Sequence, residues 1–221
     1  PASMTKMMSM YIILEAINNG SMQWDEVIRV SEHAASLGGS QIYLKPGEEM
    51  QVRDLFKSIA IASANDAVTA LAERVAGTEE AFVEKMNAKA KELGMNDTVF
   101  KNPTGLTEEG HLTTPYDMSI IGRHLVQDYP EIIEFSGLYE DYIRQDTESP
   151  FWLVNTNKLL KYVDGVDGLK TGYTQEAGYC LTATANRGEM RVIAVVMGAS
   201  KSDIRNQEVT RLIEYAYGQY E

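Results

Sequence analysis

The first eighteen residues carry apolar side chains around almost the whole circumference of the helix that they predict. Pro1 is tolerated at a helix start, and Asn19-Gly20 is a typical helix end. Because a helix that is apolar on all sides is buried on all sides, we expect this segment at the centre of the fold. Its apolar positions are Met4, Met7, Met8, Tyr11, Ile12, Leu14 and Ala16.

The middle of the chain mixes irregular stretches with amphipathic helices. Residues 26–30 predict a short strand, and residues 41–52 predict a β-hairpin that turns at Pro46-Gly47. Thr114-Pro115-Tyr116-Asp117 is a strong helix start, with threonine as the N-cap and proline at the first helical position. The predicted helices cover residues 52–62, a second stretch that ends at Gly77, residues 78–94 and residues 115–127, with a break between the first two at residues 63–66.

After Pro130 the pattern changes to that of strands. Residues 139–146 alternate between apolar and polar positions. Three further strands are predicted as an antiparallel meander over residues 169–174, 178–186 and 190–200, with the last turn at Arg187-Gly188. A closing helix begins near Ser202, and its inner side is expected to hold Ile204, Val209, Leu212, Ile213 and Ala216.

This order of elements indicates an α+β fold with an antiparallel sheet flanked by helices and an all-helical lobe, separated by a cleft. We expect one domain over residues 1–221. In it, a helical lobe of about residues 20–135 is inserted against a sheet lobe of residues 1–19 and 136–221.

Composition excludes several classes of protein. The chain has 32 acidic against 20 basic residues and a net charge of −12, which argues against binding to nucleic acid or anionic lipid. No stretch reaches the roughly 18 apolar residues of a membrane span. Cys180 is the one cysteine, so no internal disulfide forms, and its place in an apolar strand predicts a small buried hydrophobe. The scattered His33, His111 and His124 lack metal-ligand spacing, so neither a metal nor another cofactor is expected.

The first candidate for chemistry is Ser3-x-x-Lys6, at the start of the leading helix. Residues three apart share a helix face, so the lysine amine can reach the serine hydroxyl. A serine is a poor nucleophile until a base takes its proton, and a lysine is such a base only when burial or a second cation lowers its pKa. Alternatively, the pair is a capping serine beside a solvated lysine, since about one such spacing is expected by chance in a chain of this length.

Two more motifs could complete a site. Lys170-Thr171-Gly172 offers a charge and a hydroxyl to a carboxylate, and its glycine allows a substrate backbone to approach the strand edge. Leu169 stands where a phosphate-binding loop needs glycine, so that alternative is set aside. Ser63 and Asn65, at the break between two helices, can both point into a cleft, although helix capping would also explain them.

The three motifs together resemble the serine penicillin-recognising enzymes, a group with the β-lactamase/transpeptidase-like fold. Each occurs once, in the order S-x-x-K, S-x-N, K-T-G, with spacings of 60 residues (3 to 63) and 107 residues (63 to 170). Ala64 replaces the aspartate of the usual middle motif. The stretches "PASMTK", "SAND", "NPTGL", "TTPYDM", "VDGLKTGYT" and "VIAVVMGA" are similar to the low-molecular-mass penicillin-binding proteins that act as D-alanyl-D-alanine carboxypeptidases, and this resemblance covers the whole chain.

The resemblance implies the catalytic roles. Ser3 would be acylated by the penultimate D-alanine of a peptidoglycan stem peptide, with Lys6 as its base. Ser63 would relay a proton to the leaving amine, and the backbone N–H groups of Ser3 and Tyr173 would form the oxyanion hole. Water would then release the peptide, whereas β-lactam antibiotics would remain bound as acyl-enzymes.

The resemblance also implies the binding roles. Asn65 would hydrogen-bond the substrate backbone, while Lys170 would help to keep Lys6 neutral. Thr171, together with Thr174, would face the terminal carboxylate of the substrate, as would the guanidinium of Arg205.

Family members work outside the cytoplasmic membrane or in the periplasm, so the resemblance implies an extracytoplasmic protein whose signal peptide is not in this chain. In that family one or two strands precede the first helix and would cover the apolar edge of residues 190–199, so we expect the native protein to have a preceding segment, which was cut off or lies in another chain. The family's carboxy-terminal β-domain and membrane anchor are not found after Glu221.

Two other functions remain open from the sequence. One is a class A-like β-lactamase on the same fold. Such an enzyme needs an acidic side chain held over the acyl-enzyme ester, and no residue between 66 and 169 can be assigned that role from the sequence. The other is a catalytically silent relative that binds cell-wall peptide, against which the complete set of motifs argues.

Overall fold

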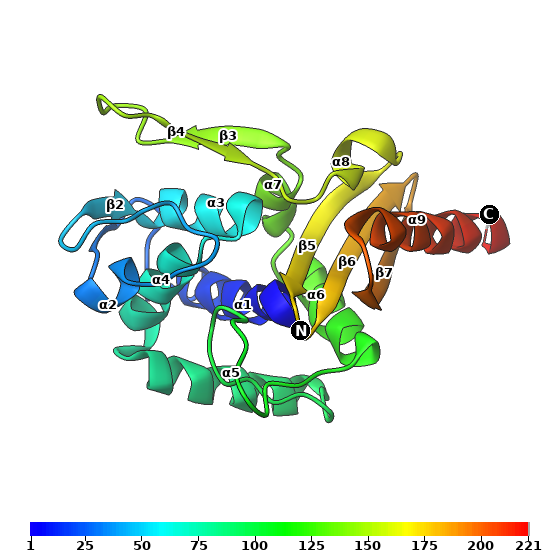
Figure 1. Ribbon diagram of the computed structural model, residues 1–221, viewed down its shortest axis with the longest axis horizontal. Coiled ribbons are helices and arrows are strands. Elements are labelled where there is room, and N and C mark those ends of the chain that lie inside the picture. The colour runs from blue at the N-terminus through cyan, green and yellow to red at the C-terminus, as the bar shows by residue number, and fades with distance from the viewer. Residues whose placement is uncertain (221) are drawn as a thin grey trace.

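The computed structural model describes residues 1–220. Its centre is the predicted first helix, which begins as a 3₁₀ turn, η1 (Ala2–Thr5), and continues as α1 (Lys6–Asn18). Every residue from Met4 to Leu14 is buried, which confirms the central position. In Figure 1 this helix runs between a group of helices on one side and the largest sheet on the other.

The amphipathic helices form where the sequence predicts them. These are α3 (Val52–Ala62), α4 (Asn65–Ala76), α5 (Glu79–Leu93) and α6 (Pro115–Asp128). The side chain of Thr114 caps α6 by accepting a hydrogen bond from the backbone N–H of Asp117. Three short helices were not predicted: α2 (Glu32–Ala35), α7 (Ile132–Ser136) and α8 (Leu159–Tyr162).

The predicted meander is an antiparallel sheet in the order β5 (Val166–Thr174), β6 (Gly178–Arg187) and β7 (Met190–Ala199). Its turn is displaced by one residue, because Arg187 pairs with Met190. The side chains of β6 alternate between the two faces: Cys180 packs into the main core, which confirms its predicted burial, and Leu181 packs towards the closing helix. Helix α6 and the η1 turn lie on the main-core face, and α9 (Ser202–Gln219) covers the other (Figure 1).

The predicted inner side of the closing helix is partly wrong. Val209 and Ile213 are buried against the sheet, but Ile204 and Leu212 are 39% and 44% exposed. A helix resting on a flat sheet buries a narrow stripe at a spacing of four residues, here Arg205, Val209 and Ile213, and Ile204 and Leu212 lie one residue to the side of it.

The predicted hairpin over residues 41–52 is also wrong. The turn at Pro46-Gly47 forms, but β2 (Glu49–Gln51) pairs with β1 (Val27–Arg29) and not with residues 41–44. The backbone N–H groups of Ile42 and Leu44 instead donate to the carboxylate of Asp66. The predicted strand over residues 139–146 is present as β3 (Glu140–Ile143), and it pairs with an unpredicted strand, β4 (Phe151–Val154).

Candidate active site

The first helix places Ser3 and Lys6 in direct contact. The Nζ atom of Lys6 lies 2.9 Å from Oγ of Ser3 and donates a second hydrogen bond of 2.8 Å to the backbone oxygen of Thr104. Lys6 is fully buried, whereas Ser3 is half-buried at the tip of the helix. The lysine is therefore not a solvated surface residue. This rules out the alternative interpretation of the Ser3-x-x-Lys6 spacing as a capping serine beside a solvated lysine.

Burial lowers the pKa of both lysines in the site. Removal from water strongly lowers the pKa of Lys6, and the positive charge of Lys170 lowers it further. Burial, with a contribution from the Arg205 guanidinium, lowers the pKa of Lys170 to about 7. A neutral Lys6 amine has a lone pair that can accept the proton of the serine hydroxyl, as a general base requires.

The break between α3 and α4 brings Ser63 and Asn65 to the same place. Ser63 adopts a left-handed conformation (φ 60°, ψ 37°), which ends α3 and turns its hydroxyl to within 3.0 Å of Nζ of Lys170. Asn65 is 3% exposed, and its Oδ1 atom is buried without a hydrogen-bond partner among the described residues. A buried amide oxygen without a partner is rare in folded proteins, and it marks this position as unusual.

Strand β5 carries the Lys-Thr-Gly motif past the nucleophile. A Cβ atom on Gly172 would lie 3.0 Å from the backbone nitrogen of Ser3, so the glycine makes room for the protein's own backbone where we expected a substrate to need the space. The hydroxyl of Thr171 hydrogen-bonds that of Thr156 over 2.7 Å. Tyr173 is 53% exposed and stacks on Tyr179 with ring centroids 4.2 Å apart.

The last two predicted residues lie at the same end of the sheet. Thr174 accepts a hydrogen bond from the backbone N–H of Ala177, which closes the turn between β5 and β6. Arg205 is 6% exposed and lies over the ring of Tyr179, with its centre 6.0 Å from the ring centroid. Among residues 1–220 no carboxylate is within ion-pair distance of its guanidinium, so a buried cation is left for an anionic ligand.

Three residues that the motifs did not single out contribute to the site. Thr104 provides the carbonyl that accepts from Lys6, and Gly105 packs against the turn that carries Ser3. Thr156 connects two motifs, because its backbone N–H donates to Ile61 near Ser63 while its hydroxyl bonds Thr171. Thr104 and Gly105 lie in the "NPTGL" stretch, which was noted only as a likeness to relatives; Thr156 had no signal of its own.

The histidines stand apart from this arrangement. His111 bonds the hydroxyl of Thr5 over 3.0 Å, and burial lowers its pKa to about 4, so it is neutral. His33 and His124 pair with Glu79 and Asp128 on the surface. In the described part of the chain no three His, Cys, Asp or Glu residues are grouped to hold a metal ion. None of the helices there combines the length and apolarity needed to cross a membrane.

The chain is similar to known D-alanyl-D-alanine carboxypeptidases. Residues 1–201 match the family model of the D-alanyl-D-alanine carboxypeptidases, peptidase family S11. The chain is 58% identical over 221 residues to the D-alanyl-D-alanine carboxypeptidase DacF of Bacillus subtilis, and it spans 57% of the length of that relative.

Solved structures of similar proteins have the same fold. The carboxypeptidase DacD of Francisella tularensis superimposes with a TM-score of 0.93 at 34% identity, over 98% of this chain and 64% of that one. Penicillin-binding protein D2 of Listeria monocytogenes in its cefotaxime-bound form gives a TM-score of 0.87 at 33% identity, over 98% of this chain and 87% of that one. The predicted penicillin-binding-protein fold is thereby confirmed.

Proposed function

Because this chain belongs to the D-alanyl-D-alanine carboxypeptidase family, we propose that it is the catalytic part of a serine carboxypeptidase that removes the terminal D-alanine from peptidoglycan stem peptides. The observation that carries the proposal is the 2.9 Å contact between Oγ of Ser3 and the fully buried amine of Lys6. No metal or organic cofactor is needed for this chemistry.

In the acylation step, Oγ of Ser3 attacks the carbonyl carbon of the penultimate D-alanine and its proton passes to Nζ of Lys6. The peptide bond to the terminal D-alanine then breaks, and the proton that Lys6 took would pass to the leaving amine by way of the hydroxyl of Ser63, which Lys170 contacts. The backbone N–H groups of Ser3 and Tyr173 would stabilise the oxyanion, at roughly 3–4 kcal/mol each. Water cleaves the ester of Ser3 in a second step and releases the shortened peptide.

Polar groups of the candidate site support the binding of a carboxy-terminal peptide. The side-chain amide of Asn65, which is 3% exposed, would hydrogen-bond the substrate backbone. The hydroxyl of Thr171 and the unpaired guanidinium of Arg205 would bind the terminal carboxylate. Since peptidoglycan lies outside the cytoplasmic membrane, we also propose that the protein works there, and that β-lactams acylate Ser3.

The proposed activity is tested by release of D-alanine from diacetyl-Lys-D-Ala-D-Ala, with Ser3→Ala as the control. We expect release by the wild type and none by the variant. Intact mass spectrometry after penicillin treatment should show one long-lived adduct per chain. Rapid turnover of penicillin would instead indicate a β-lactamase, and neither release nor adduct would indicate a catalytically silent relative.

Replacement of Arg205 separates carboxylate binding from chemistry. Arg205→Ala should raise KM for the D-Ala-D-Ala peptide by about tenfold or more, because charge-assisted hydrogen bonds are worth about 1.5–3 kcal/mol. The rate of acylation by penicillin should fall less, since the strained amide contributes its own reactivity. Steady-state kinetics and stopped-flow acylation measure the two effects, and equal losses in both would contradict this role for Arg205.

A further inference from the structure

The side chain of Asn65 is held in place by a neighbouring stretch of irregular backbone, residues 38–48, which we call the support segment. The Nδ2 atom of Asn65 donates to the backbone oxygen of Gly38 over 2.9 Å, and its backbone N–H donates to Ser40 over 2.7 Å. The first contact fixes which end of the amide faces the segment and so leaves Oδ1 unpartnered. A Cβ atom on Gly39, which has a φ of +72°, would lie 2.8 Å from Nδ2, so the segment fits closely around this amide.

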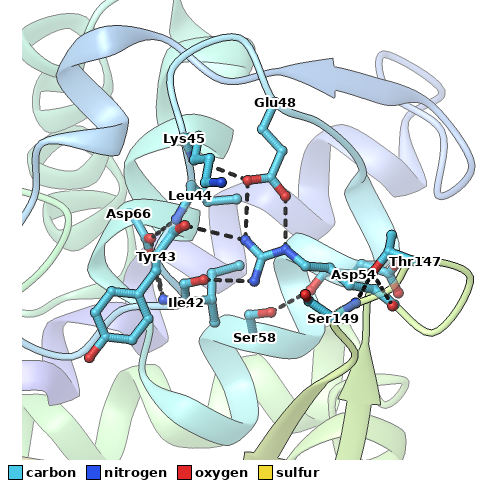
Figure 2. Close-up of polar contacts among 11 residues, drawn as sticks. Ile42, Tyr43, Leu44, Lys45, Glu48, Asp54, Ser58, Asp66, Thr147 and Ser149 are labelled. Atoms are coloured by element: carbon cyan, nitrogen blue, oxygen red, sulfur yellow. Dashed lines mark hydrogen bonds and ion pairs between the residues drawn. The ribbon is translucent and has the colours of Figure 1, made fainter.

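The support segment is also tied to the start of α4 by the next side chain. The carboxylate of Asp66, which is fully buried, accepts hydrogen bonds from the backbone N–H groups of Ile42 and Leu44 over 3.1 and 3.0 Å (Figure 2). These contacts tie two backbone N–H groups of the support segment to the start of α4.

Two backbone oxygens of the support segment contact Arg144, which follows β3 in the hairpin beside α3. Nη1 of Arg144 donates to the backbone oxygen of Ile42 over 2.8 Å, and Nη2 lies 3.5 Å from that of Tyr43. The same guanidinium forms a forked ion pair with Glu48, with distances of 2.8 and 3.2 Å (Figure 2). Both side chains are mostly buried, with 15% and 21% exposure.

The backbone on both sides of this contact is strained. Tyr43 and Arg144 have φ values of 58° and 57°, a left-handed conformation that costs a residue with a side chain about 1–2 kcal/mol. Such conformations persist where surrounding contacts hold them. Here those contacts are the guanidinium on one side of the segment and the Asp66 carboxylate on the other, so the segment is clamped between the β3–β4 hairpin and α4.

We propose that Arg144 is a positioning residue for substrate binding, which acts through the support segment on the amide of Asn65. This inference rests on the proposed function, in which the side-chain amide of Asn65 hydrogen-bonds the backbone of the stem peptide. Loss of the guanidinium would release the carbonyl groups of Ile42 and Tyr43 and let the support segment move. This movement would weaken the hydrogen bond between the segment and the Asn65 side chain. Because Asn65 binds the substrate before bonds break, the effect falls on KM more than on kcat.

A double-mutant cycle tests this coupling. Arg144→Ala should raise KM for diacetyl-Lys-D-Ala-D-Ala about fivefold or more with little change in kcat, and should raise it less than twofold when introduced into Asn65→Ala. Arg144→Lys keeps the positive charge beside Glu48, but its ammonium group cannot form the forked pair with Glu48 and bond Ile42 at the same time. We therefore expect a KM between those of the wild type and Arg144→Ala. An equal rise in KM in both backgrounds would overturn the proposal.

Arg187→Ala is the matched control. It removes a forked pair between the last residue of β6 and Glu214 of α9, with distances of 2.6 and 3.2 Å. Its KM should stay at the wild-type value. If Arg187→Ala raised KM as much as Arg144→Ala, the effect would come from general loosening of the fold, and the proposal would fail.

Hydrogen exchange separates this inference from the proposed activity. In Arg144→Ala the backbone N–H groups of Ile42, Leu44 and Asn65 should exchange faster, whereas those of β6 should not change. If the wild type released no D-alanine, faster exchange at Asn65 would still support the coupling while contradicting the function. Unchanged exchange at Asn65 would overturn the coupling whatever the activity.

Discussion

Lys6→Ala should acylate with penicillin about 10²- to 10⁴-fold more slowly than the wild type, the usual contribution of a general base. The reason is the buried amine at 2.9 Å from Oγ of Ser3: without it, no group keeps the serine hydroxyl ready to lose its proton. Noncovalent affinity for the peptide should change little, because Lys6 contacts Ser3 and Thr104 and is covered from solvent. Stopped-flow fluorescence with a labelled penicillin measures the rate.

Lys6→Met serves as the control for packing, since it fills a similar volume without an amine. We expect it to be as slow as Lys6→Ala while it unfolds at a temperature close to that of the wild type. Labelling of either variant at the wild-type rate would contradict the assignment of Lys6 as the base.

Gly105→Ala should be almost as damaging, although Gly105 takes no part in the chemistry. Its φ is +88°, and a Cβ atom there would lie 1.9 Å from the backbone oxygen of Ala2 and 2.9 Å from the nitrogen of Ser3. The turn that carries the nucleophile must therefore move, and a displacement of about 1 Å at a reacting group can cost about 10²-fold in rate. The acylation rate with penicillin is the measurement.

Gly110→Ala is the matched control in the same loop. Gly110 has a similar φ of +81°, but the nearest atom to its Cβ would be the flexible end of the Lys101 side chain at 3.1 Å. Both variants carry a backbone strain of about 1–2 kcal/mol, and Gly105→Ala should lose further stability because its Cβ atom overlaps the backbone of Ala2. Only Gly105→Ala should lose acylation; equal rates in the two variants would show that the contact with residues 2 and 3 does not position Ser3.

Local periodicity predicted most helices and the main sheet because these elements bury one regular face. Strand β4 was missed because Phe151, Trp152, Leu153 and Val154 are apolar without alternation. The hairpin over residues 41–52 was wrong because Ile42 and Leu44 bond the side chain of Asp66, a contact between distant parts of the chain that no local pattern records.

The candidate site divides in the same way. Ser3, Lys6, Ser63 and Lys170 contribute side chains to the candidate site, so their residue types form motifs that can be found in the sequence. Thr104 contributes a backbone oxygen, which any residue could supply. Its residue type therefore gives no indication of this role. Arg144 and Glu48 lie 96 positions apart and meet only because the β3–β4 hairpin folds against the support segment.

The central claim is that a neutral Lys6 takes the proton of Ser3, and the pH dependence of penicillin acylation tests it most directly. Because burial and Lys170 lower the pKa of Lys6, the acylation rate constant should rise with pH to a midpoint well below 10.5. Lys170 attracts the ligand carboxylate while protonated, so the rate should turn down as the pH passes its pKa of about 7. A single rise centred near pH 10.5 would mean that Lys6 is an ordinary ammonium group, and would contradict this account.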